Sequence, residues 1–455
     1  MIIIKKIFIW FIIFICIKNE LRIPFKRRFT KELTHEFMTE NMFFNTIIVN
    51  IKIGTPPQDI PLAIKSLEYI NYIYDNKVYK YDVIKYSQKD SKTCKILSDE
   101  PTYYVENFFG FDYAYTLEDT IQINNLTISD FPFFVATEMS YNPPYTIHNG
   151  TGGILGLRIE PQGHYDEISS QNFIDILYNK NIIQSKSFSF KVNDKDEDGE
   201  LIIDPLFYNE LYGTESFSHT RVHHINEEAP LNWYMIFDNV YYGSEKGYEF
   251  KHQFRNARVT FEVGVIFGID IFRDLIRKEF FNEQIKLGNC GEVIYNDFIT
   301  FYCKDEVDTS KIKPLIFEDK EMRFKFILNQ EDLWFKKDGK KYFLIIFRLG
   351  YFEETDWTLG KPFLKKYQLV FDKDKYIIGI FNQNMFHKSE IFFIKFFYEI
   401  ISFCGILAVL FLFYFFWKKK NKNSKKVYKY KAFEMDEYSK EDFLERNSIS
   451  TSCDA

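Results

Sequence analysis

Short runs in which apolar and polar residues alternate recur along most of the chain, with turn residues between them. Alternation with a period of two is typical of half-buried strands. Helical patterns are few, and we expect helices only at 173–178 and 269–281. The pattern therefore predicts a mainly β body, with its clearest strands at 46–53, 120–128, 200–203, 323–328 and 342–347.

Two strongly apolar segments lie outside this pattern, one near each end of the 455-residue chain. Lys5 and Lys6 precede an apolar run at 7–17, which predicts a signal peptide at 1–18. No small-x-small cleavage site follows this run, so the segment could instead remain as an anchor. The residues at 400–417 carry no formal charge. As a helix they would span about 27 Å, close to the thickness of the hydrocarbon core of a membrane.

A lysine-rich stretch at 418–426 follows the second apolar segment directly. Basic residues beside a transmembrane helix favour the cytoplasmic side. We therefore expect a stalk and transmembrane helix at 384–417, a cytoplasmic tail at 418–455, and a body that is lumenal or extracellular. These features predict a single-pass type I membrane protein of the secretory pathway or cell surface. The net charge of −6 gives no reason to propose nucleic-acid binding.

Five blocks of sequence, in this order and at these spacings, resemble the pepsin-like aspartic proteases. The resemblance covers about residues 21–382, and it implies a bilobal β fold with an N-terminal lobe at 44–213 and a C-terminal lobe at 214–383. The basic segment at 19–43 is similar to a short prosegment, although an ordinary linker after the signal would look the same. The blocks are Ile53-Gly54-Thr55-Pro56, Gly152-Gly153-Ile154-Leu155-Gly156-Leu157, 173–190, 199–203 with Leu231-Asn232-Trp233-Tyr234, and Trp357-Thr358-Leu359-Gly360 continuing through Val370-Phe371-Asp372 to Ile378-Gly379.

Both catalytic loops that the family would place in these blocks are altered. Lys65, followed by Ser66 and Leu67, stands where the first Asp-Thr-Gly is expected. The best match to the second loop puts Glu262 at the aspartate and Gly264 at the glycine. A rival at 308–310 reads Asp-Thr-Ser, but it lacks the glycine and lies close to the C-terminal block. The sequence contains no Asp-Thr-Gly or Asp-Ser-Gly.

These substitutions bear directly on the family's chemistry. Two facing carboxyl groups share one proton in these enzymes, because two like charges so close together cannot both ionise. A charged lysine has no acceptor and cannot take one of the two places. We therefore predict that the site is catalytically silent and that Lys65 forms an ion pair with Glu262. The alternative is that both side chains drifted after activity was lost and point to solvent.

The hairpin that covers the cleft in the family is also altered. Counting back from Asp119-Thr120 places Gly110 at a flap glycine and Asn107 where the family has a tyrosine. Tyr103 or Tyr104 could replace that tyrosine if the hairpin shifted. We favour the simpler interpretation, in which the aromatic residues of this stretch pack on one another.

Cysteine and asparagine positions give further expectations for a lumenal body. Cys94, Cys290 and Cys303 are the cysteines of that part, and Cys290 could pair with Cys303 across the strand-like stretch between them. The tripeptides that begin at Asn125 and Asn149 are glycosylation acceptors if they are exposed.

Metal-binding patterns are weak. His219, His223 and His224 lie near two glutamates, but no helical spacing supports a site, and a solvated loop is the better interpretation. The acidic run that begins at Asp194 imitates the start of a calcium loop, yet Pro205 stands where the bidentate glutamate belongs. We expect no metal and no cofactor.

Two functions follow from the sequence. The first is a membrane-anchored pepsin-like protein without activity that binds a peptide or protein ligand in its cleft. The second is a working aspartic endopeptidase with non-standard catalytic loops, because Glu262 keeps one carboxylate. The sequence does not decide the ligand or the oligomeric state.

Overall fold

The computed structural model divides the chain into two compact units, Met1–Asn382 and Gln383–Ala455. The predicted signal peptide lies outside the described residues, as do most of the predicted transmembrane segment and all of the predicted tail except Lys418. In the described part of the chain, no helix is both long and apolar enough to cross a membrane. The structure describes residues 20–28, 46–78, 83–106, 109–138, 150–159, 172–193, 198–205, 208, 212, 217–222, 232–244, 247–295, 297–349, 356–381, 410–412, 414, 417 and 418.

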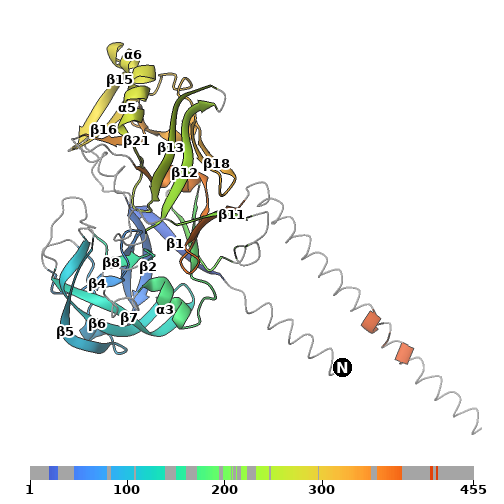
Figure 1. The fold of residues 1–455 in the computed structure, drawn as a ribbon. Helices are drawn as coiled ribbons and strands as arrows, with labels where there is room; N and C mark the ends of the chain where they lie inside the picture. Colours follow the sequence, from blue (N-terminus) through green and yellow to red (C-terminus); the bar gives the residue numbers. More distant parts are fainter. Residues whose placement is uncertain are drawn as a thin grey trace, which may run out of the picture. The chain divides into compact units, whose positions relative to one another are not determined.

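The first unit is mainly β, as predicted (Figure 1). It contains a sheet of 13 strands in which strands far apart in the sequence lie side by side. The strand order is β11-β24-β23-β9-β10-β1-β2-β3-β8-β4-β7-β6-β5. The strands are β1 (Leu21–Arg28), β2 (Thr46–Ile53), β3 (Gln58–Lys65), β4 (Tyr72–Tyr74), β5 (Lys95–Glu106), β6 (Phe109–Ile123), β7 (Leu126–Glu138), β8 (Gly153–Gly156), β9 (Ser187–Val192), β10 (Gly199–Ile203), β11 (Phe217–Arg221), β23 (Leu369–Asp372) and β24 (Ile377–Phe381).

A second sheet of 11 strands forms from the later part of the chain. Its order is β18-β17-β12-β13-β22-β14-β21-β16-β20-β19, and β15 pairs with β16. The strands are β12 (Tyr234–Ser244), β13 (Gly247–Val259), β14 (Ile266–Gly268), β15 (Cys290–Tyr295), β16 (Phe298–Lys304), β17 (Leu315–Asp319), β18 (Phe324–Leu328), β19 (Trp334–Lys337), β20 (Lys340–Phe343), β21 (Ile345–Arg348) and β22 (Trp357–Leu359).

Two of the strands predicted from the sequence are each two strands in the structure. The run at 120–128 is divided by a turn in which Asn124 has a φ of 52°, a left-handed conformation that asparagine adopts more readily than most residues. The run at 342–347 is divided at Leu344: both parts pair with β16, but β20 has β19 on its other side whereas β21 has β14. In the first run the alternation changes phase at Asn124-Asn125, a turn signal that we overlooked, whereas the second run is continuously apolar and gives no sign of its break.

The helices are short and lie between strands. Asn172 caps the first turn of α3 by accepting a hydrogen bond from the Ile174 N–H at 3.1 Å, which is the usual role of asparagine there. A π-helical segment interrupts the helix predicted at 269–281. The segments are η1 (Gln88–Asp90), α3 (Phe173–Asn179), α5 (Asp270–Ile276), η3 (Arg277–Phe281), α6 (Asn282–Lys286), η4 (Gln330–Leu333) and α7 (Lys361–Lys366).

An aromatic cluster joins the two sheets near their centre. Phe261, from the second half of the chain, packs on Phe188, Phe190 and Phe371 of the first sheet at centroid distances of 5.9, 4.4 and 5.1 Å. Trp233 packs on the same group and donates its indole N–H to the Leu157 carbonyl at 2.8 Å. Each buried ring contributes roughly 2–3 kcal/mol of hydrophobic stabilisation. The cluster therefore fixes the residue beside Phe261 relative to the first sheet.

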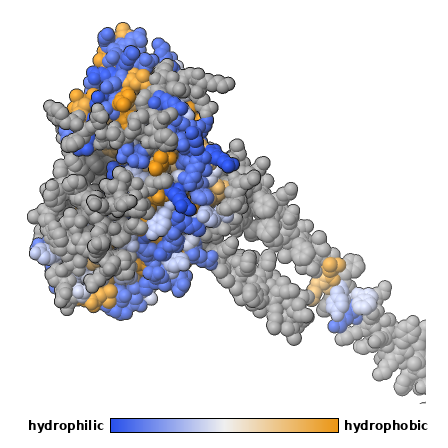
Figure 2. Space-filling view, viewed as in Figure 1, coloured by the Kyte–Doolittle hydropathy of each residue, from blue (hydrophilic) through white to orange (hydrophobic). Residues whose placement is uncertain are grey.

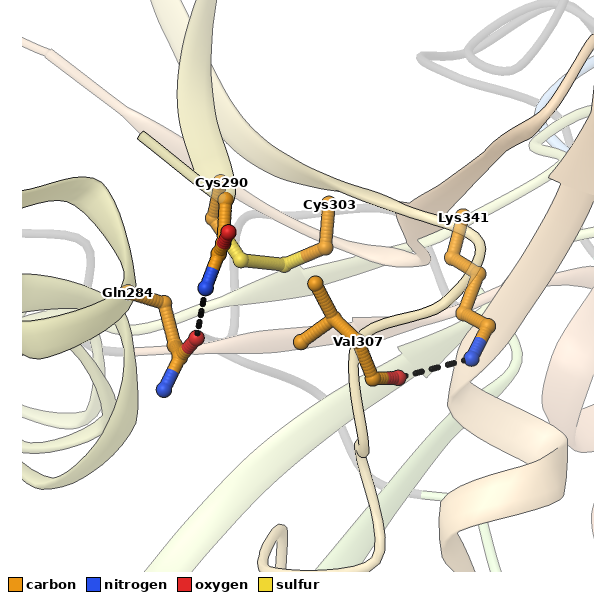
Figure 3. The surroundings of a disulfide bond; sticks show 6 residues. Gln284, Cys290, Cys303, Val307 and Lys341 are labelled. Atoms are coloured by element: carbon orange, nitrogen blue, oxygen red, sulfur yellow. Dashed lines mark hydrogen bonds between the residues drawn. A yellow bond between two sulfur atoms is a disulfide. The ribbon is translucent and has the colours of Figure 1, made fainter. Parts of the chain in front are cut away.

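A disulfide joins Cys290 and Cys303, the pair expected from the sequence (Figure 3). The two residues lie directly opposite each other on β15 and β16, with their Cα atoms 3.9 Å apart. Nearby, Lys341 donates to the Val307 carbonyl at 2.8 Å. Cys94 is a free, partly buried thiol.

The outer surface of the described part is mostly polar. Figure 2 shows hydrophilic residues over most of the described surface on this face, with small separate groups of hydrophobic residues. On this face the described surface therefore offers no extended apolar patch. The features that distinguish this molecule lie inside it.

Candidate functional site

The first altered loop follows β3 and leads into β4. Lys65 ends β3 and pairs in parallel with Gly156 of β8, and its carbonyl accepts a hydrogen bond from Leu157 N–H at 2.8 Å. A Cβ atom on Gly156 would lie 2.6 Å from the backbone of Tyr69, so the loop packs on this strand only because Gly156 has no side chain. The glycine block of the sequence thus supports the loop that carries Lys65.

The second altered loop connects β13 with β14. Phe261 is fixed in the aromatic cluster, and Glu262 follows it with only 7% of its surface exposed. The rival triplet is elsewhere, because Asp308 is exposed and accepts from Ser310 N–H of its own turn at 2.9 Å. The structure therefore brings Glu262, and not Asp308, to the loop that follows Lys65.

The Glu262 carboxylate is held by four donors. Its Oε1 accepts from the Ser66 N–H at 2.5 Å and from the Leu67 N–H at 3.2 Å. Its Oε2 accepts from the Ser66 hydroxyl at 2.6 Å and from the Phe261 N–H at 3.0 Å. A carboxylate has about four lone-pair positions. These donors therefore use essentially all of its acceptor capacity.

Lys65 is buried near this carboxylate and is attracted by it. Burial lowers the pKa of Lys65, while attraction by Glu262 and Glu68 opposes that shift. The attraction agrees in sign with the ion pair that we predicted, and a direct contact between the two side chains stays a prediction. The solvent-pointing alternative is wrong, since both residues are buried.

Glu68 is a further site residue that the sequence did not indicate to us. It is fully buried, and neither carboxyl oxygen has a hydrogen-bond partner in the part of the chain that the structure describes. Burial raises the pKa of Glu68 well above its usual value, and Glu262 adds to this shift, whereas Arg158 and Lys65 oppose it. The available signal was the position of Glu68, a charged residue in a short loop between two buried strands.

The flap residues are only partly described. β5 and β6 form a hairpin in which Gly110 lies opposite Val105, and the role of Gly110 as a flap glycine stays a prediction. Asn107 lies outside the described residues. The assignment of Asn107 as the replacement for the flap tyrosine therefore stays a prediction.

The remaining candidate residues for glycosylation and metal binding are only partly described by the structure. Asn125 is exposed in the turn between β6 and β7, whereas Asn149 lies outside the described residues. His219 lies in β11, whereas His223 and His224, like Asn149, lie outside the described residues. Over the described ranges, no three His, Cys, Asp or Glu side chains gather in a way that could hold a metal ion.

Comparison with known proteins identifies one family. The family model described as eukaryotic aspartyl protease matches residues 47–383, about three quarters of the chain. No curated protein matches the sequence. The matched range contains both altered loops and almost all of both sheets.

Proposed function

Because this chain belongs to the eukaryotic aspartyl protease family, we propose that it is a catalytically inactive member that binds a peptide or protein segment. The observation that carries the proposal is the buried lysine at the first catalytic position, beside a carboxylate whose acceptor sites are already occupied. The ligand would bind where the family binds its substrates, between the two lobes and under the flap.

The inactivity follows from what the family's reaction requires. A general base must accept a proton from the attacking water, and a second carboxyl group must supply one to the substrate. Glu262 has essentially no lone pair left for water, and three of its four donors are backbone N–H groups that cannot accept a proton. Lys65 places an amino group where the second carboxyl group is required.

Glu68 favours the second candidate function, an active endopeptidase. It supplies a second carboxyl group, and its raised pKa would keep it protonated as an acid while Glu262 is the base. Its complete burial opposes this role, because a catalytic acid must reach the substrate. We therefore rank this function second.

A cleavage and retention experiment tests both functions. The full chain would be incubated with casein peptides at acid and neutral pH, and bound and free peptides would be analysed by mass spectrometry. We expect retained peptides that are not cut. Cleavage that disappears in both Glu262→Gln and Glu68→Gln would overturn the proposal in favour of the endopeptidase, and tight binding of a statine inhibitor would argue in the same direction.

The cellular setting is part of the proposal. We infer a single-pass type I protein of the secretory pathway or cell surface, supported by the apolar run at 400–417 and the lysines after it. The disulfide and the exposed acceptor Asn125 suit an oxidising lumen. Protease would be added to sealed vesicles that carry the full chain, and we expect the body to be protected. Digestion of the body with protection of the tail would show the opposite orientation.

A further inference from the structure

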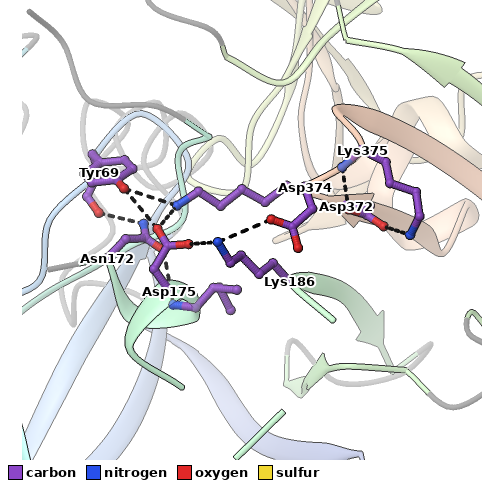
Figure 4. Close-up of polar contacts among 9 residues, drawn as sticks. Tyr69, Asn172, Asp175, Lys186, Asp372, Asp374 and Lys375 are labelled. Carbon is purple, nitrogen blue, oxygen red and sulfur yellow. Dashed lines mark hydrogen bonds and ion pairs between the residues drawn. The ribbon is translucent and has the colours of Figure 1, made fainter. Parts of the chain in front are cut away.

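The loop that supplies donors to Glu262 is also attached to α3, through Tyr69 (Figure 4). This loop covers residues 66–71, between β3 and β4. Tyr69 is buried. Its carbonyl accepts from the Asn172 amide at 2.7 Å, and its hydroxyl donates to Asp175 Oδ2 at 2.9 Å. The start of α3 therefore holds Tyr69 at both its backbone and its side chain.

Asn172 joins the loop to two other elements. Its amide group also donates to the Gly156 carbonyl of β8 at 3.2 Å, and its Oδ1 caps α3. Asn172 and Asp175 are three residues apart across the first turn of α3, so both reach the same loop residue. One helix start thus fixes Tyr69 relative to the strand on which the loop packs.

Two lysines from later parts of the chain hold the Asp175 carboxylate in place. Its Oδ1 lies 3.1 Å from the Lys186 ammonium, and its Oδ2 also accepts from the Lys373 ammonium. Lys186 precedes β9, and Lys373 belongs to the turn between β23 and β24. Lys373 and Asp175 are both buried, so water screens their interaction poorly. The carboxylate has partners on both oxygens and little freedom to turn away from Tyr69.

Lys373 also contacts Tyr69 directly. Its Nζ lies 4.4 Å from the centre of the Tyr69 ring and 3.4 Å from the hydroxyl. A cation over an aromatic ring is attracted by the electrons of the ring. The β23–β24 turn therefore holds Tyr69 both through Asp175 and by its own lysine.

We propose that Tyr69 is a positioning residue for the candidate site, and that its attachment to α3 and to the β23–β24 turn holds the Ser66 and Leu67 N–H groups against Glu262. Tyr69 is two residues from Leu67 and three from Ser66, so a displacement of Tyr69 moves these donors. Hydrogen bonds weaken steeply when their angle departs from linearity. This role goes beyond the proposed function, because it concerns the geometry of the site and holds for a binding site and a catalytic site alike.

The same turn holds a second tyrosine, which provides a matched control. The Tyr208 hydroxyl donates to buried Asp372 and accepts from the Lys375 ammonium at 2.9 Å. The Lys375 Nζ lies 4.8 Å from the centre of the Tyr208 ring. Tyr208 packs on Phe217 of β11 and does not belong to the site loop. Its hydroxyl therefore has the same kinds of partner as that of Tyr69, but at a different place.

Hydrogen exchange in the full chain, without any ligand, tests the positioning role. The protection of the Ser66 and Leu67 amides is measured relative to that of Val240, in the middle of the second sheet, so that a general change of stability cancels. We expect Tyr69→Phe to lower this ratio about tenfold, the range for one hydrogen bond to a charged group. Tyr208→Phe should leave it within twofold of the native value. An unchanged ratio in Tyr69→Phe, or an equal fall in Tyr208→Phe, would overturn the proposal.

A double-mutant cycle separates positioning from a general contribution to stability. If Tyr69 acts through the loop, Glu262→Gln should change the unfolding equilibrium constant at least threefold less in a Tyr69→Phe background than in the native chain. In a Tyr208→Phe background its effect should be the same as in the native chain. Independent effects of Tyr69→Phe and Glu262→Gln would show that Tyr69 stabilises the fold without positioning the site.

Discussion

Substitution of Glu262 by glutamine tests the electrostatic reasoning at the site. An amide keeps one acceptor oxygen and replaces the other with an NH₂ group, which cannot accept. The less costly orientation places this NH₂ group at the Oε2 position, where the Ser66 hydroxyl can turn to accept from it but the Phe261 N–H loses its partner. One buried N–H without a partner costs about 1–3 kcal/mol. The opposite orientation would leave both the Ser66 and Leu67 N–H groups unpaired.

The lost charge adds to this cost. The two remaining hydrogen bonds are no longer charge-assisted, and Lys65 loses an attraction that favours its charged form. We therefore expect Glu262→Gln to lower the free energy of unfolding by about 2–4 kcal/mol. Urea unfolding measures the change as a lower midpoint at constant slope. Glu283→Gln, on an exposed position of α6, is the control and should change stability by less than about 0.5 kcal/mol.

A double-mutant cycle separates the two contributions to this cost. In a Lys65→Met background the charge term is absent, so Glu262→Gln should cost less than it does in the native chain. A loss no larger than that of Glu283→Gln would refute the four-donor description of Glu262. An equal cost in both backgrounds would refute the attraction between Lys65 and Glu262.

Three further predictions concern stability. Burial raises the pKa of Asp319 from 3.8 to about 6. Between these pH values the folded chain holds a proton that the unfolded chain releases, so stability falls as the pH rises. Asp319→Asn should be up to about 3 kcal/mol more stable than the native chain at pH 7 and equal to it below pH 4, and equal stabilities at pH 7 would contradict this. Replacing both Cys290 and Cys303 by alanine should cost about 3 kcal/mol in the same urea assay, because the bond closes a loop with a sequence separation of 13, and an unchanged midpoint would show that it contributes nothing. Phe261→Ala should cost about 3–5 kcal/mol by leaving a cavity between the sheets, and a cost below 1 kcal/mol would mean that the cluster closes around the gap.

Apolar alternation and sequence blocks predicted much of this fold. The mainly β body and the family are confirmed, and strands such as 46–53 occur as predicted, because buried strands need alternating apolar residues. The break at Leu344 could not be found in this way, because a change of partner strand leaves a continuous apolar run intact, whereas the adjacent asparagines at 124 and 125 did mark a turn that we overlooked.

The candidate site was predicted less completely than the fold. The resemblance to the pepsin-like proteases identified Lys65 and Glu262, which the structure brings to one place. It did not show that Ser66 and the backbone would occupy the Glu262 carboxylate, since those hydrogen bonds depend on how two loops 196 residues apart approach each other. The role of Glu68 was missed for the same reason, because its burial and its neighbours are set by tertiary packing.

The strand order of the first sheet has a consequence for how this protein folds during its synthesis. β1 starts at Leu21 and β24 ends at Phe381, yet they lie in one sheet, separated by only β10, β9 and β23. A ribosome must therefore synthesise almost the whole first unit before this sheet can close. Such distant pairings make folding slow and leave unpaired strand edges exposed in the meantime. We expect nascent chains that stop before residue 369 to depend on chaperones, however well their local sequence favours β structure.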